Sequence, residues 1–187
     1  IKGLYLYHSV THDIRAVSII KKLGKNLLAE YYLNAAEDWD WYEDKLTYAN
    51  SILPEAMLYS YLITAEPTFK KVAIKSFDFL LNKMFVDDHL KVISNNGWYQ
   101  KNAEPHQYGE QPIDVACTIQ TLDIFHKIFG IQKYEKMMKI AFDWFLGRNH
   151  LRQTIYNAAT GGCHDGLEKE NVNLNQGAES TICYLIA

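Results

Sequence analysis

Three long stretches of the chain place apolar residues at helical spacing, with polar residues between them. They cover residues 13–34, 67–85 and 132–147. Apolar residues at every third or fourth position are typical of a helix that buries one face, so we predict three long helices. Their apolar stripes are Ile14, Val17, Ile20, Leu23, Leu27, Leu28 and Tyr31; Phe69, Val72, Ala73, Phe77, Leu80, Leu81 and Met84; and Tyr134, Met137, Met138, Ala141, Phe142, Phe145 and Leu146.

Each long helix is followed by a long loop and then by a second, more uniformly apolar helix. The loops span 34–51, 95–111 and 157–176, and they are rich in Trp, Tyr, Asn, Asp, Glu and Gly. The second helices are expected at 53–64, 112–130 and 177–187, and Pro54 and Pro112 suit their first turns. Loops of this length are usually functional when they are ordered.

The three helix–loop–helix segments align as an internal repeat. Glu55, Asp114 and Glu179 open the three second helices, and their positions are 59 and 65 residues apart. A period near 60 residues fits two helices and one long loop, and helical hairpins that repeat can stack or close into a ring. If the second helices form the inner layer, their N-termini and the preceding loops converge on one end of the ring.

The fold class predicted from this repeat is all-α, an (α/α) toroid of helical hairpins. We expect a single all-helical domain over 1–187. Three hairpins correspond to about half of an (α/α)6 barrel, and the chain starts at Ile1 and stops at Ala187 inside an apolar segment. We therefore expect the sequence to be a fragment of a longer protein.

Composition and motifs exclude several classes of function. The net charge is −3, and no run of Lys and Arg forms the basic stripe of a nucleic-acid binder. No apolar run approaches the ~20 residues of a membrane span. Nucleotide-binding glycine motifs are absent, so we expect no cofactor, and no zinc-type ligand spacing suggests a metal. The three cysteines lie far apart, which favours a reducing compartment, and we expect a cytoplasmic protein.

Several runs resemble a known family. They are WDWYEDKLTYANSILPEAML, NGWYQKNAEPHQYGEQPIDVA, AFDWFLGRN, and TGGCHDGL followed by VNLNQGAESTICYLIA. The chain resembles bacterial helical domains associated with group 1 glycosyltransferases, whose fold is similar to the toroids of six-hairpin glycosidases and N-acylglucosamine 2-epimerase-like proteins. The resemblance implies a saccharide ligand and a glycosyltransferase domain in the same or a partner chain. It also leads us to expect Gln at position 110, so we leave Glu110 out of the predicted site.

Glu43 and Asp165 are the predicted catalytic residues. Glycosidic-bond chemistry needs one carboxyl group as general acid and another as base or nucleophile. Glu43 lies among Trp and Tyr residues that would desolvate its carboxyl group, and Asp165 lies in the HDG turn. Aromatic platforms and hydrogen-bonding side chains complete a saccharide site. These predicted substrate-binding residues are Trp41, Tyr42, Asn50, Trp98, Tyr99, Gln111, His164, Asn175, Gln176 and Glu179.

Several of these residues also have a purely structural interpretation. Glu179 and the equivalent Glu55 and Asp114 are carboxylates in helical first turns, where the helix dipole favours them. Asn50 and Asn175 can cap helices, Trp98 can be a core residue, and Asp165 can form a turn before a glycine. At the level of function, the alternative is a helical-repeat scaffold whose concave surface binds a protein.

Overall fold

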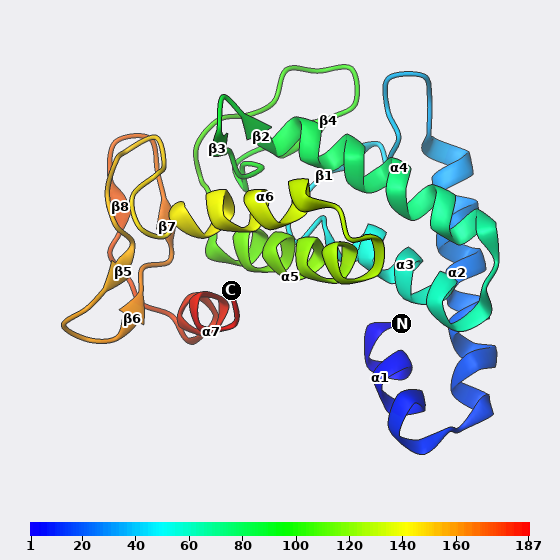
Figure 1. Cartoon of the computed structure of the whole chain (residues 1–187). Helices are drawn as coiled ribbons and strands as arrows, with labels where there is room; N and C mark the ends of the chain where they lie inside the picture. Colours follow the sequence, from blue (N-terminus) through cyan, green and yellow to red (C-terminus); the bar gives the residue numbers. More distant parts are fainter. The chain divides into compact units, whose positions relative to one another are not determined.

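The computed structural model describes residues 1–187 and is mostly helical, with about 54% of the chain in seven helices (Figure 1). The helices are α1 (Lys2–Thr11), α2 (Ile14–Asn34), α3 (Ile52–Thr64), α4 (Pro67–Met84), α5 (Pro112–Phe129), α6 (Gln132–Asp143) and α7 (Ala178–Ile186). The strands are eight two-residue segments in four antiparallel pairs. They are β1 (Lys45–Leu46) with β4 (Tyr99–Gln100), β2 (Phe85–Val86) with β3 (His89–Leu90), β5 (Tyr156–Asn157) with β6 (Gly162–Cys163), and β7 (Gly166–Leu167) with β8 (Val172–Asn173).

All six helices predicted from the sequence are present. The one large difference is α6, which ends at Asp143 although the apolar pattern continues to residue 147. The residues after α6 tighten into turns, in which the Trp144 N–H donates to the Ala141 carbonyl and the Phe145 N–H to the Phe142 carbonyl. Bonds of this 3₁₀ type commonly end α-helices. Helix α1 was not predicted, and it buries none of its residues.

The chain forms two compact units. One consists of 1–44 and 52–80, and the other of 45–51 and 81–187. In the first unit, α1 packs on α2 and α3, and α2 packs on α3. In the second unit, α5 packs on α6 and α7. No helix of the structure is both long enough and apolar enough to cross a membrane.

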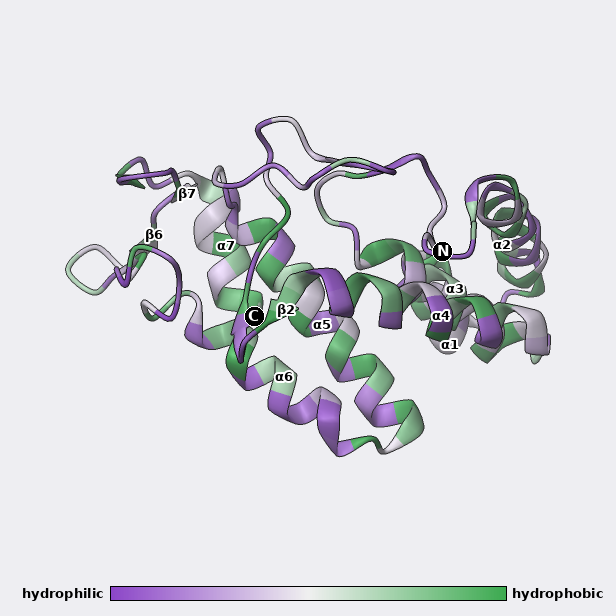
Figure 2. Ribbon diagram, turned by 90° about the horizontal axis from the view of Figure 1, so that it is seen from above, coloured by the Kyte–Doolittle hydropathy of each residue, from purple (hydrophilic) through white to green (hydrophobic).

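The long helices bury their predicted stripes to different degrees. In α4 all seven stripe residues are at most 1% exposed. In α2 Ile20 and Tyr31 are buried, but Ile14 is 76% and Leu23 is 39% exposed. The buried residues of α2 also include the small residues Ala16 and Gly24. At Gly24 the neighbouring helices come close, since an added Cβ would lie 2.7 Å from the Ser60 Oγ and 3.2 Å from Phe69. Figure 2 shows the apolar and polar positions that alternate along α6.

We predict that Gly24→Val destabilises the protein by about 1–3 kcal/mol, because the added methyl groups have no space between α2, α3 and α4. Gly3 in α1 is the matched control, since a Cβ there meets nothing within 4 Å. Urea unfolding of Gly24→Val and Gly3→Val measures the difference. Equal midpoints for the two variants would contradict this packing.

Candidate functional site

The candidate site is a polar pocket of about 290 Å³ in the second unit. Its walls come from the second and third repeat loops and from the first turn of α7. The lining residues are Asn95, Glu110, Gln111, Asp165, Gly166, Glu168, Asn173, Gly177, Ala178, Glu179 and Ser180. Three of the residues predicted from the sequence, Gln111, Asp165 and Glu179, therefore line one cavity.

A backbone pairing joins the two loops at the pocket. The Glu110 N–H donates to the Leu167 carbonyl and the Leu167 N–H donates to the Glu110 carbonyl, both at 2.9 Å. Gly166 allows this approach, because a Cβ at that position would overlap the Glu110 carbonyl oxygen. The pairing explains why residues more than fifty positions apart share one wall.

Asp165 holds the N-terminus of α7. Its Oδ1 accepts hydrogen bonds from the Gly177 N–H at 2.8 Å and from the Ser180 hydroxyl at 2.7 Å, and its Oδ2 accepts one from the Asn175 amide. Burial alone would raise the pKa of Asp165, but the bonds from Ser180, Gly177 and Asn175 outweigh it and lower the pKa. Asp165 is therefore ionised at neutral pH, which suits a hydrogen-bond acceptor or base and excludes a proton donor.

Glu110 is the buried carboxylate of the pocket, with 5% of its surface exposed. Its Oε2 accepts a 2.6 Å hydrogen bond from the Trp144 indole, and its Oε1 lies 3.3 Å from the His150 Nδ1. The other ring nitrogen of His150 donates to the Glu168 carbonyl at 2.8 Å. The bond to Glu110 raises the pKa of His150, against the effect of burial. A protonated imidazole donates from both nitrogens, so His150 ties Glu110 to the Glu168 segment.

Sequence reasoning missed Glu110 because the family resemblance favours glutamine there. Its position could have indicated it, because Glu110 lies at the end of the second loop, directly before the Gln–Pro at the start of α5. The Trp144 partner comes from another part of the repeat, and no spacing rule links the two residues.

Four other predicted residues of the second unit do not line the pocket. Asn175 bonds to Asp165, while the Gln176 Oε1 accepts a hydrogen bond from the Thr160 hydroxyl at 2.6 Å. The His164 Nδ1 lies 3.1 Å from the Leu174 carbonyl. Asn50 is buried, and its amide makes two 2.9 Å hydrogen bonds to the backbone of Thr47. Asn50 therefore closes a turn and does not cap α3.

Trp98 and Tyr99 lie around the β1–β4 pair, and both are partly exposed. Trp98 has a positive φ of 62°, which is unusual for a bulky residue. The Tyr99 hydroxyl accepts a 3.2 Å hydrogen bond from the Lys83 ammonium, which also lies over the Tyr99 ring. The core interpretation of Trp98 is therefore not supported by its burial.

Three predicted residues belong to the first unit. Trp41 and Tyr42 are 0% and 1% exposed, and their rings pack together at a centroid distance of 5.2 Å. They have no open face on which a sugar could stack, and we do not include them in the candidate site. The Glu43 side chain is exposed, in contrast with the desolvated environment predicted for it.

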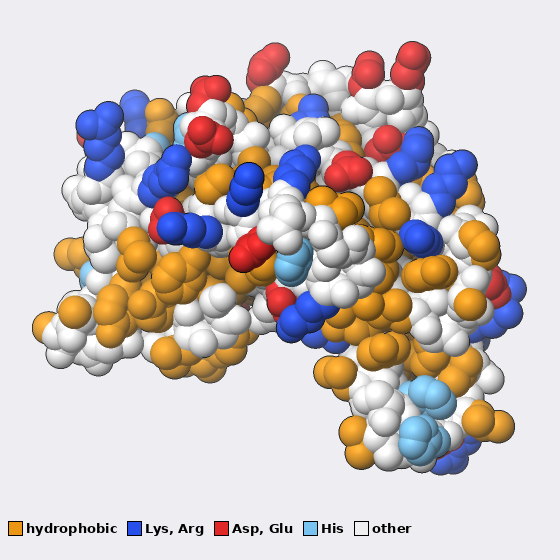
Figure 3. Space-filling model, in the orientation of Figure 1, with side chains coloured by type: hydrophobic (Ala, Val, Ile, Leu, Met, Phe, Trp, Pro, Cys, Tyr) orange, Lys and Arg blue, Asp and Glu red, His pale blue; other side chains and the backbone are white.

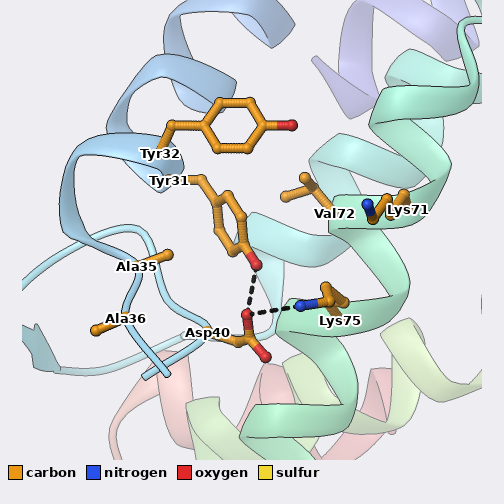
Figure 4. Close-up of a pocket in the computed structure, with 8 residues that line it drawn as sticks. All are labelled: Tyr31, Tyr32, Ala35, Ala36, Asp40, Lys71, Val72 and Lys75. Atoms are coloured by element: carbon orange, nitrogen blue, oxygen red, sulfur yellow. Dashed lines mark hydrogen bonds and ion pairs between the residues drawn. The ribbon is translucent and has the colours of Figure 1, made fainter. Parts of the chain in front are cut away.

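A smaller cavity of about 220 Å³ lies in the first unit (Figure 4). Three of its polar side chains bond to one another: Asp40 accepts from the Tyr31 hydroxyl at 2.6 Å and from the Lys75 ammonium at 3.4 Å. This cavity is lined by fewer polar residues than the pocket of the second unit, so it offers a ligand fewer partners.

The equivalent carboxylates of the three second helices all lie in first turns, as the repeat predicts, but their environments differ. Glu55 is buried and pairs with the Lys2 ammonium at 2.8 Å. Asp114 is 2% exposed, and its Oδ1 accepts a 2.8 Å hydrogen bond from the Ala49 N–H. Glu179 is exposed at the pocket.

The thiol of Cys163 is not an activated nucleophile. Cys163 is buried, and burial raises its pKa to about 12, so the reactive thiolate is scarce at neutral pH. No group of three or more His, Cys, Asp and Glu side chains is placed to hold a metal ion.

Comparison with known proteins yields no match to any protein-family model and none to a curated protein sequence. The candidate site is therefore defined by its own geometry.

We predict that Gly166→Ala destabilises the protein by about 1–3 kcal/mol, because the added methyl group clashes with the Glu110 carbonyl and separates the two loops. Urea unfolding measures the loss, with Gly3→Ala as control. Unchanged stability of Gly166→Ala would show that the two loops are not held together by this pairing.

The Asp114 carboxyl group predicts a pH dependence of stability. Burial raises its pKa to about 8, although the N–H groups of Ala49 and Asn50 partly oppose the shift. The folded state thus keeps a proton that the unfolded chain, with an ordinary pKa near 4, releases. The contribution of Asp114 to stability is full below pH 4 and declines as the pH rises to about 8.

Asp114→Asn keeps an oxygen acceptor for Ala49 and cannot titrate. The stability of the wild type relative to this variant should fall between pH 4 and 8, by at most about 1.4 kcal/mol per pH unit. Urea unfolding at a series of pH values measures it. A constant difference between the two proteins would contradict the raised pKa.

Proposed function

We propose that the protein is a carbohydrate-active module that binds a saccharide in the pocket of the second unit. The observation that carries the proposal is the pairing of Glu110 with Leu167, which gathers amide, hydroxyl and carboxylate groups from two repeat loops into one pocket. Directed polar groups of these kinds suit the hydroxyls of a sugar. A volume near 290 Å³ is just below the ~300–1,000 Å³ typical of ligand pockets, which favours a small ligand or one unit of a larger one.

The charges of the lining residues indicate which class of ligand the pocket favours. Glu110, Asp165, Glu168 and Glu179 line the pocket, and no Lys or Arg does. The N-terminus of α7, where an anion could otherwise bind, already holds the Asp165 carboxylate. A neutral saccharide therefore fits better than a sugar phosphate, a uronic acid or a nucleotide sugar.

We further propose, on the family resemblance, that the hairpins belong to an (α/α) toroid of which this chain is about half. The module would work in the cytoplasm beside a glycosyltransferase domain of the same or a partner chain. A catalytic form of the proposal assigns the base to Asp165, which lines the pocket and is ionised.

A protein-binding scaffold is the second candidate function. The observation that favours it is the exposure of Ile182, Leu185 and Ile186 on α7, which are 55%, 70% and 52% exposed. Figure 3 shows hydrophobic side chains gathered at the lower left, where Figure 1 places α7.

A titration with neutral saccharides and their phosphorylated forms tests the proposal, with calorimetry as the measurement. We expect binding of at least one neutral sugar and weaker binding of its phosphate. Gln111→Ala should weaken binding about 3- to 10-fold, because it removes an amide that can form hydrogen bonds to a ligand in the pocket.

Gln176→Ala is the matched control. The Gln176 side chain bonds to Thr160 and does not line the pocket, so its loss should leave the affinity unchanged. Absence of binding by every saccharide would refute the proposal and favour the scaffold.

A further inference from the structure

Two aromatic rings lie next to each other beside the β1–β4 pair. Tyr48 follows β1 and Trp98 precedes β4, and their ring centroids are 6.0 Å apart with the planes inclined by 35°. The Tyr48 side chain is 58% exposed and Trp98 is partly exposed. Neither ring is buried in the core, so the pair has faces available to a ligand.

The backbone holds both rings in defined positions. On the Tyr48 side, the Ala49 N–H donates to the buried Asp114 carboxyl group, and the Asn50 side chain bonds twice to Thr47. Ala49, with a φ of 51°, and Trp98, with a φ of 62°, are both in the left-handed region. Such conformations cost roughly 1–3 kcal/mol each and often mark binding sites.

Two short connections link the aromatic pair to the pocket. Asn95 lines the pocket and precedes Trp98 by three residues, so their Cα atoms are at most about 11 Å apart. Gln111 also lines the pocket, and one turn of α5 later Asp114 bonds to Ala49, the neighbour of Tyr48. Both Trp98 and Tyr48 are therefore connected to lining residues of the pocket through only a few intervening residues.

We propose that Tyr48 and Trp98 form a second subsite, which stacks a sugar ring next to the unit held in the pocket. The inference rests on the proposed function and makes the ligand a neutral oligosaccharide of two or more units. Aromatic faces carry partial negative charge and attract the C–H groups that line the face of a sugar ring. The hydroxyls at the edge of such a ring stay in water, which agrees with the exposure of Tyr48.

A chain-length series tests the proposal. The probes are β-1,4-linked glucose and β-1,4-linked N-acetylglucosamine oligomers and α-1,4-linked glucose oligomers, each from the monosaccharide to the tetrasaccharide. For the wild type we expect at least one series in which the disaccharide or trisaccharide binds about 10-fold more tightly than the monosaccharide.

Tyr48→Ala and Trp98→Ala should each lose about 3- to 10-fold of the affinity for the oligomers and none of that for the monosaccharide. Tyr48→Phe should retain the wild-type profile because it keeps the ring. Trp98→Asn is a second variant at that position and should show the same loss as Trp98→Ala. It removes the ring but keeps a residue that tolerates the positive φ. Tyr32→Ala, which removes a 61% exposed ring of the first unit, is the control.

Three results would overturn the subsite. The wild type could bind monosaccharides and oligomers with equal affinity, the variants could lose affinity for monosaccharides and oligomers equally, or the variants could retain both affinities unchanged. These outcomes differ from failure of the proposed function, in which no saccharide of any length binds to the wild type.

Discussion

Two backbone hydrogen bonds join Glu110 to Leu167, and the pocket of the second unit depends on them. They bring the loop before α5 against the loop before α7, so that Gln111 and Asp165 line the same cavity. Side-chain contacts alone are a weaker constraint, because each can be replaced by water. Paired backbone groups fix the separation of two segments, and here the pairing needs Gly166, because a Cβ at that position would overlap the Glu110 carbonyl oxygen.

Charged side chains around this pairing are held by specific donors. Asp165 takes its hydrogen bonds from the first turn of α7, and Glu110 takes its bonds from Trp144 and His150. A carboxylate that is partly buried needs such partners, because an unpaired charge is costly in a low-dielectric environment. The same bonds orient the carboxylates, so the pocket presents fixed oxygen atoms to a ligand. Preorganised groups of this kind bind with a smaller entropic cost.

The helices could be predicted from the sequence because a helix that buries one face has apolar residues at regular spacing. This spacing can be recognised within a single helix, without knowledge of its neighbours. All seven stripe positions of α4 are buried as predicted. The site was less accessible to prediction. The DWDWY run looks like an exposed aromatic platform, yet Trp41 and Tyr42 are buried, since a loop that folds back over a helix can supply core residues. Glu110 acquires its environment from Trp144, 34 positions away, through a contact that no local pattern encodes.

Positions that the sequence aligns as a repeat share a place in their helices without sharing a chemical environment. Glu55, Asp114 and Glu179 occupy the same turn of three helices, but one pairs with a lysine, one is buried and bonds to a backbone N–H, and one is exposed at the pocket. The helix dipole acts on all three and therefore does not account for the difference. The difference comes from the segment packed against each carboxylate. In this chain, therefore, the segment packed against the first turn of each helix decides whether its carboxyl group is buried or exposed.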